Sequence, residues 1–127
     1  MERAPIILPE SQVEPEVWDD PVQGRLGFRT LFSRDRTPSH ALTTGVAELP
    51  VGGWLGLHRH DPPEVYYVLD GEGMVTLDGT EHPVRAGSSV FVPGDLEHGI
   101  RNVAGVPLRV FYVFAVDSFT DVEYRFS

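Results

Sequence analysis

The chain has 127 residues, and its 10 basic and 19 acidic side chains give a formal net charge of −9 at pH 7. This acidic balance argues against nucleic acid and anionic membranes as partners, and no apolar run approaches the length of a membrane-spanning helix. The absence of cysteine excludes disulfides and thiolate metal ligands, and because residues 1–5 show no signal-peptide pattern, we expect a cytoplasmic protein.

Residues 1–24 are rich in proline and acidic side chains, and the sequence does not fix their structure beyond a short turn or strand between residues 10 and 20. After them, stretches rich in β-branched and aromatic residues alternate with glycine and proline turns, which predicts strands. The expected strands cover residues 25–32, 41–48, 54–59, 65–69, 74–77, 89–92, 98–103 and 107–116. Asp78-Gly79 favours a type I′ turn, so residues 74–77 should form a hairpin with the strand that follows. Short strands of this kind are typical of an all-β sandwich or barrel, and the length suits one domain, residues 1–127.

Two histidines on one predicted strand carry the strongest chemical signal. His58 and His60 are two residues apart, and side chains at that spacing on a strand point to the same face. Glu64 follows after a proline-containing break, and His98 begins a later predicted strand. Three imidazole nitrogens and one carboxylate are suitable ligands for a divalent transition metal. These four residues are therefore the candidate metal ligands.

Each candidate ligand also has an ordinary interpretation. A histidine pair on a strand can be a surface feature or a satisfied core pair, and a glutamate before a strand can be a surface carboxylate. The same ordinary role is expected for His40 and His82, which lie in polar turns and should be solvated.

Glycine, proline and asparagine residues frame the candidate ligands in two blocks, residues 52–71 and 87–102. The blocks contain, in order, Gly52, His58, His60, Glu64 and Gly71, then Gly87, Pro93, His98 and Asn102. This order and spacing resemble the two-part signature of the cupin family. The resemblance implies a single jelly-roll β-barrel, also called a double-stranded β-helix, with its core at residues 40–117. It also implies one divalent transition metal, Fe, Mn, Ni or Zn, held by the three histidines and the glutamate.

One position departs from the cupin pattern. Asp95 stands where the family has glycine, and Gly94 comes one residue earlier. Both residue types form turns, so we expect a shifted turn and an intact site.

Alternation predicts which side chains face the barrel interior. Between residues 64 and 69, Glu64, Tyr66 and Val68 should point inward. The final strand should line the barrel with Leu108, Val110, Tyr112 and Phe114. The expected outward set is too apolar for a solvated face and consists of Leu55, Leu57, Val65, Tyr67 and Leu69. We therefore expect a covering layer from this chain or from a second copy, and we predict a homodimer.

Two tyrosines are candidate catalytic residues. Residues 57–66, Glu97-His98 and residues 119–124 together resemble the small cupin lyases that act on dimethylsulfoniopropionate. In those enzymes one tyrosine follows the ligand glutamate and another lies near the C-terminus, and Tyr66 and Tyr124 match these places. A nearby dication stabilises phenolate, so either tyrosine could serve as a base. The alternatives are a core aromatic for Tyr66 and a tail residue packed on the barrel for Tyr124.

Three functions remain open from the sequence, all with a small molecule as ligand. The first is a metal-dependent lyase that expels a β leaving group from a carboxylate-bearing substrate. The second is an oxygenase in which the same ligands hold Fe(II). The third is a cupin that binds a small molecule without catalysis. Elimination product, oxygen uptake and ligand binding without turnover distinguish the three.

Overall fold

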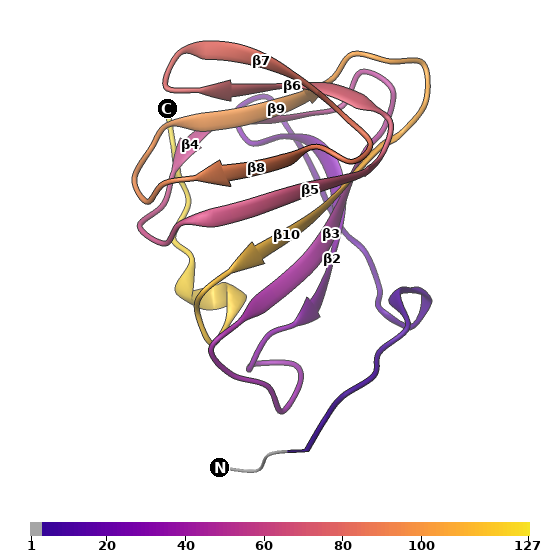
Figure 1. Cartoon of the computed structure of the whole chain (residues 1–127), viewed down its shortest axis with the longest axis vertical. Coiled ribbons are helices and arrows are strands. Elements are labelled where there is room, and N and C mark those ends of the chain that lie inside the picture. Colours follow the sequence, from indigo (N-terminus) through magenta and orange to yellow (C-terminus); the bar gives the residue numbers. More distant parts are fainter. Residues whose placement is uncertain (1–3) are drawn as a thin grey trace.

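The computed structural model describes residues 4–127, and residues 1–3 of the N-terminal segment lie outside the described part. Nearly all of its regular elements are strands (Figure 1). In chain order the elements are η1 (Glu10–Gln12), a 3-10 helix, β1 (Glu16–Asp20), β2 (Gly24–Phe32), β3 (Thr43–Leu49), β4 (Trp54–Arg59), β5 (Glu64–Asp70), β6 (Glu72–Leu77), β7 (Thr80–Arg85), β8 (Ser89–Val92), β9 (His98–Asn102), β10 (Leu108–Phe114), η2 (Phe119–Asp121), a second 3-10 helix, and β11 (Arg125–Phe126). No helix among residues 4–127 has the length and apolarity needed to cross a membrane.

The strands belong to one curled sheet. Their order across it is β7-β6-β9-β4-β2-β3-β10-β5-β8, with β1 beside β2 and β11 beside β4. The strand pairings are antiparallel. The sheet twists and curls on itself (Figure 1), so that one face of it encloses a single core. The prediction of an all-β jelly-roll barrel is confirmed.

Local chemistry explains where the strands turn and begin. The hairpin between β6 and β7 has positive φ at both Asp78 (48°) and Gly79 (82°), as a type I′ turn requires. The strand predicted to begin at residue 41 begins at Thr43 instead. Ala41 has a φ of 69°, and this left-handed conformation does not occur within a strand.

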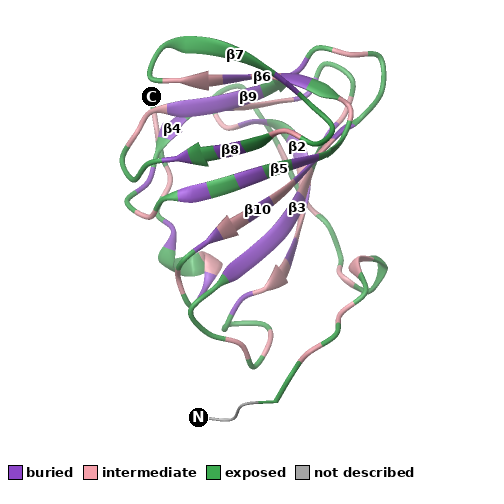
Figure 2. Ribbon diagram, in the orientation of Figure 1, coloured by how far each residue is buried: buried purple, intermediate pink, exposed green. Residues whose placement is uncertain are grey.

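The core lies between the inner faces of the strands, as alternation predicts. β5 is buried at Glu64, Tyr66 and Val68 and exposed at the residues between them, which gives the alternating colours of this strand in Figure 2. β10 is likewise buried at every second residue from Leu108 to Phe114.

One strand breaks the predicted alternation. Leu55 on β4 was expected to point outward, but it packs against the core. The reason is a register shift between Leu55 and His58 in the pairing of β4 with β9. This irregularity reverses the facing of Leu55 while His58 remains inside and Leu57 outside.

Both ends of the chain add to the sheet. Residues 4–24 contain η1 and β1, in agreement with the short turn or strand expected between residues 10 and 20. β1 lies beside β2, and at the other end β11 lies beside β4. η2 and β11 had no counterpart in the sequence prediction.

Candidate metal centre

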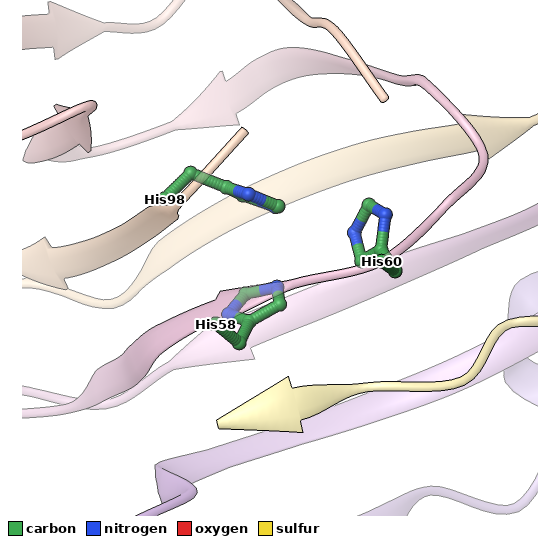
Figure 3. Close-up of side chains that lie close together, drawn as sticks. All are labelled: His58, His60 and His98. Atoms are coloured by element: carbon green, nitrogen blue, oxygen red, sulfur yellow. The ribbon is translucent and has the colours of Figure 1, made fainter. Parts of the chain in front are cut away.

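Three different parts of the sheet deliver the candidate ligands to one place. His58 lies near the end of β4, His60 directly after that strand, and His98 at the start of β9. Because β4 and β9 are paired, His58 and His98 stand opposite each other in register. Glu64 begins β5 and is buried with the histidines. Figure 3 shows the three imidazole rings turned toward one another.

The three histidines could hold a metal ion together. One ligand nitrogen from each ring lies within 4.8 Å of the others, and all three side chains are fully buried. Glu64 joins them through its Oε1 atom, which is 3.2 Å from the Nε2 atom of His60 and 3.4 Å from that of His98. The structure therefore brings all four predicted ligands together, and their role as ligands remains a prediction.

Main-chain carbonyl groups orient each imidazole. The Nδ1 atom of His58 donates to the carbonyl oxygen of Gly56 at 2.7 Å. Those of His60 and His98 donate to the carbonyl oxygens of Pro62 and Leu96, each at 2.8 Å. A carbonyl oxygen only accepts hydrogen bonds, so Nδ1 must carry the proton in each ring. In a neutral ring the Nε2 lone pair then faces the centre.

The Nε2 atoms of the three histidines and the carboxylate of Glu64 are all hydrogen-bond acceptors in this tautomer, so a cation between them would be stabilised. The Nε2 atoms of His58 and His98 are buried and have no hydrogen-bond partner among the described residues. When His60 is neutral, its Nε2 lone pair faces the carboxylate oxygen Oε1 of Glu64 at 3.2 Å. Lone pairs that converge in a buried place require a proton or a metal cation between them. The residues therefore fit a divalent ion, and hydrogen bonds at the far nitrogen are typical of metal-binding histidines.

The charge states of two ligands agree with this fit. Burial lowers the pKa of His58 to about 4, so its ring is neutral at pH 7 and its lone pair is available. Burial opposes ionisation of Glu64, but the adjacent His60 and His98 rings outweigh it. The pKa of Glu64 therefore lies below its usual value, and the group remains a carboxylate.

The loop before β9 supports the turn that carries His60. The amide of Asp95 donates to the carbonyl oxygen of His60 at 2.8 Å. We expected a turn shifted onto Gly94, but Asp95 itself has a φ of 62° and takes the left-handed position. Aspartate tolerates the left-handed conformation better than most residues. Gly94 is needed for another reason, because a Cβ there would collide with the carbonyl oxygen of Asp61.

Both predicted tyrosines lie beside the histidines. The ring of Tyr66 is 6.3 Å from that of His98, and its buried hydroxyl has no hydrogen-bond partner among residues 4–127. The ring of Tyr124 stacks on His58, with centroids 4.9 Å apart and an interplanar angle of 27°. Burial raises the pKa of both phenols well above the usual value of 10, and the charge of Glu64 raises it further. Their catalytic role remains a prediction.

Other aromatic residues near the site were not among the candidates. Tyr112, expected only to line the barrel, lies opposite Tyr66 in the pairing of β10 with β5, and its hydroxyl also lacks a partner within the described chain. Trp18 and Phe126 each contact the ring of Tyr124. The alternation of β10 predicted that Tyr112 faces the barrel interior, and this could have identified it as a neighbour of the site. Nothing in the sequence marks Trp18, because its position depends on the pairing of β1 with β2.

Comparison with known proteins agrees with this architecture. The model of the cupin domain family matches residues 45–114. Dimethylsulfoniopropionate lyase DddW of Ruegeria pomeroyi is 45% identical over 109 residues, which cover 85% of this chain and 70% of the lyase. An oxalate-binding protein of Thermotoga maritima is 30% identical over 92 residues, which cover 72% of this chain and 76% of that protein. Among solved structures, a predicted oxalate decarboxylase from Thermotoga maritima superposes with a TM-score of 0.77 at 26% identity, over 87% of this chain and 99% of the other.

Proposed function

The chain belongs to the cupin family, and on that basis we propose that it is a divalent-metal-dependent lyase acting on a small molecule that bears a carboxylate. The observation that carries the proposal is the buried convergence of three histidine lone pairs and one carboxylate, with no donor between them among the described residues. The lyase of Ruegeria pomeroyi supports the reaction class, because its similarity extends over most of the chain. Dimethylsulfoniopropionate is therefore the substrate to test first.

The roles of the residues follow from their positions. His58, His60, His98 and Glu64 would hold the ion. When bound, a divalent ion would supply positive charge that attracts a substrate carboxylate, acidifies the adjacent carbon and favours phenolate over phenol. Tyr66 or Tyr124 would accept, at its phenolic oxygen, the proton from the carbon next to the carboxylate.

The proposed elimination balances without a further reactant. The electrons of the broken C–H bond form the new C=C bond, and the bond from the β carbon to the leaving group breaks. A dimethylsulfonium group is positively charged, so it departs with the electron pair as a neutral thioether. The products are an unsaturated carboxylate, the thioether and the proton on the tyrosine, which passes to solvent before the next turnover. Neither oxygen nor a redox partner is consumed.

Binding without catalysis is the second candidate. It is favoured by the similarity to the oxalate-binding protein of Thermotoga maritima and by the raised pKa of both phenols, which leaves them protonated in the metal-free protein. A carboxylate ligand would then occupy the same site and remain unchanged.

One experiment separates the candidates. Metal-free protein is loaded in turn with Fe(II), Mn(II), Ni(II) or Zn(II) and incubated with dimethylsulfoniopropionate without oxygen, and thioether and unsaturated carboxylate are quantified. Metal-dependent product above the rates of metal-free protein and of free metal supports the lyase. Oxygen uptake without elimination would favour a dioxygenase instead, and saturable binding without turnover would favour a binding protein.

A further inference from the structure

The histidine cluster is closed to solvent. The side chains of His58, His60 and His98 are fully buried. The cavity that Glu64 and Tyr124 line beside them has a volume of about 30 Å³, which is room for about one water molecule. A ligand with several heavy atoms can therefore reach the cluster only if part of its cover moves.

Residues 123–127, here called the cover segment, form part of this cover. The ring of Tyr124 contacts those of His58 and His60, with centroids 4.9 and 5.3 Å apart. The ring of Phe126 contacts that of His58 at 5.4 Å, and Figure 3 shows β11, the yellow arrow, beside this histidine. Two of the three histidines thus lie against side chains of the cover segment.

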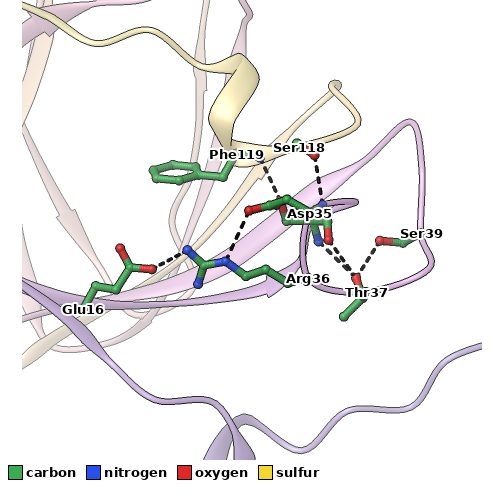
Figure 4. A network of polar contacts seen from close by, with 8 residues as sticks. Glu16, Asp35, Arg36, Thr37, Ser39, Ser118 and Phe119 are labelled. Carbon is green, nitrogen blue, oxygen red and sulfur yellow. Dashed lines mark hydrogen bonds and ion pairs between the residues drawn. The ribbon is translucent and has the colours of Figure 1, made fainter.

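The chain is held firmly just before the cover segment. The amide of Phe119 in η2 donates to the hydroxyl of Ser33 at 2.9 Å, and the amide of Asp35 donates to the hydroxyl of Ser118 at 3.1 Å (Figure 4). Val122 is buried in the core. These contacts make η2 and Val122 a fixed base, from which the cover segment extends over the cluster.

The cover segment is attached less firmly than its neighbours. β11 has two residues and pairs with β4, and the amide of Ser127 adds one hydrogen bond to the carbonyl oxygen of Leu57 at 3.0 Å. Phe114 and Tyr66, which also contact the histidines, belong to β10 and β5, seven-residue strands with a paired strand on each side. Because local opening costs least where few contacts hold the backbone, the cover segment should open before these strands do.

One exposed side chain fastens the cover segment to the loops around the site. The Nη2 atom of Arg125 lies 3.1 Å from Oδ1 of Asp61 and 2.7 Å from Oδ1 of Asp95. Asp61 directly follows His60, and Asp95 lies in the loop before β9, which begins at His98. The side chains of Asp61 and Asp95 are 85% and 66% exposed, and ion pairs between exposed groups are weak. Such a contact can hold the segment closed and still release it.

We propose that the cover segment is a gate over the histidine cluster and that Arg125 is the positioning residue that keeps the gate closed. The gate opens to admit the metal ion and a small ligand, and its closure returns Tyr124 to the face of His58. The metal centre itself rests on the proposed function, but the gate does not depend on the lyase reaction.

Metal exchange measures opening of the gate without any substrate. Uptake of Co(II) by metal-free protein and its release into excess EDTA are followed by visible absorption. We expect Arg125→Ala to raise both rates by the same factor, at least about threefold, and to leave the dissociation constant unchanged. Arg125→Lys should restore part of the wild-type behaviour, because lysine keeps the charge but not the forked geometry. Arg101→Ala is the matched control and should change neither rate, since its similarly exposed ion pair with Glu81 joins β9 to β7.

The absence of cysteine allows a second test with an engineered disulfide. Arg125 on β11 and Arg59 on β4 are exposed and lie directly opposite each other. Residues so placed have Cα atoms about 4.5–5.5 Å apart, which suits a disulfide. Arg59→Cys combined with Arg125→Cys should, once oxidised, exchange Co(II) at least about tenfold more slowly than the same protein reduced with a phosphine. A disulfide introduced in the same way between positions Glu72 and Arg85, opposite each other on β6 and β7, should slow neither rate.

Each outcome decides the proposal. Faster release with unchanged uptake in Arg125→Ala would overturn the gate, because Arg125 would then only stabilise the bound metal, and unchanged rates in both directions would overturn it too. Equal rates in the oxidised and reduced disulfide variant would also refute it, and this comparison remains should Arg125→Ala not fold. The two proposals fail separately: gated exchange without elimination product refutes only the lyase, and equal elimination by oxidised and reduced protein refutes only the gate.

Discussion

The three histidines take their orientation from carbonyl groups only two residues away in the sequence, at Gly56, Pro62 and Leu96. This short range means that the local backbone path, more than distant packing, sets the direction of each Nε2 atom. The carbonyl bonds also strengthen each ring as a ligand, because a hydrogen bond at Nδ1 raises the basicity of Nε2. Removal of one ring should therefore affect metal binding far more than it affects the fold.

We expect His60→Ala to lose most of its bound metal while the barrel remains folded. The substitution removes one of four ligands, but neither the sheet pairing nor the apolar core depends on that side chain. Metal content after reconstitution and dialysis measures the first effect, and circular dichroism measures the second. His82→Ala is the matched control, because this exposed residue on β7 is not among the candidate ligands. Full metal occupancy in His60→Ala would place the site elsewhere.

Tyr66→Phe should lower turnover on the true substrate by about 10²-fold or more and leave metal and substrate affinity nearly unchanged, if Tyr66 is the base. The hydroxyl has no partner among the described residues, so its removal costs no hydrogen bond and should not lower the stability of the metal-free protein. A rate loss would then belong to the chemistry.

Tyr124→Phe is the parallel test. The ring of Tyr124 stacks on His58, and the substitution removes the hydroxyl while the stacking remains. Steady-state kinetics of the two single variants, with thermal unfolding as the folding check, identify which tyrosine acts. Normal turnover in both would rule out a tyrosine base.

At the scale of elements, the sequence predicted side-chain facing and turn positions correctly where one strand face is apolar and glycine marks the turn. β5 and β10 alternate as predicted, and the Asp78-Gly79 hairpin forms. β4 differs, because its irregular pairing with β9 turns Leu55 inward, and such a shift leaves no mark in a pattern of period two.

The elements that the sequence could not predict are those set by pairing alone. β11 had no counterpart in the sequence prediction, and for β1 only a short turn or strand was expected; each adds to the side of a strand already in the sheet. Their residues carry no strong strand pattern of their own, so the positions of Trp18 and Phe126 appear only once the barrel is formed. The four candidate ligands were predictable because they lie within the spaced motifs, whereas the contacts of Trp18 and Phe126 with Tyr124 join segments that are far apart in the sequence or carry no motif.

Gly56 on β4 gives a test of that irregular pairing. Its amide donates to the carbonyl oxygen of Gln23, and a Cβ would collide with the carbonyl oxygen of Val22. We expect Gly56→Ala to lower the free energy of unfolding by about 1–3 kcal/mol, the usual cost of overpacking. Metal affinity should fall as well, because the carbonyl that orients His58 would move.

Gly105→Ala is the control for this substitution. A Cβ on Gly105 would meet no heavy atom of the described residues within 4 Å, and the residue does not have a positive φ. Alanine there should therefore leave stability unchanged or raise it by less than about 1 kcal/mol. Urea unfolding of the metal-free proteins measures both variants. Equal stability of Gly56→Ala and wild type would show that the close approach to Val22 is not rigid.

At the scale of the whole molecule, one outer face remains apolar. Phe91 on β8 is 64% exposed, and its cross-strand partner Val65 on β5 is 40% exposed. Residues 4–24 do not cover them, because Glu10 pairs with Arg29 on β2 and Arg109 on β10, which holds this described part of the N-terminal segment elsewhere. An apolar face of this kind on a small protein usually marks an interface.

We therefore expect a homodimer that buries the outer face of β5 and β8. Interfaces of this kind bury large apolar areas, so the dimer should persist at micromolar concentration in sedimentation velocity experiments. Phe91→Glu places a charge at the centre of the face and should shift the protein toward monomer, because burial of an unpaired carboxylate costs several kcal/mol. Val51→Glu is the matched control, since Val51 is similarly exposed (53%) but lies in the turn between β3 and β4. A wild-type protein that sediments as a monomer would refute the dimer, and equal dissociation in both variants would show that added charge, and not this face, weakens the association.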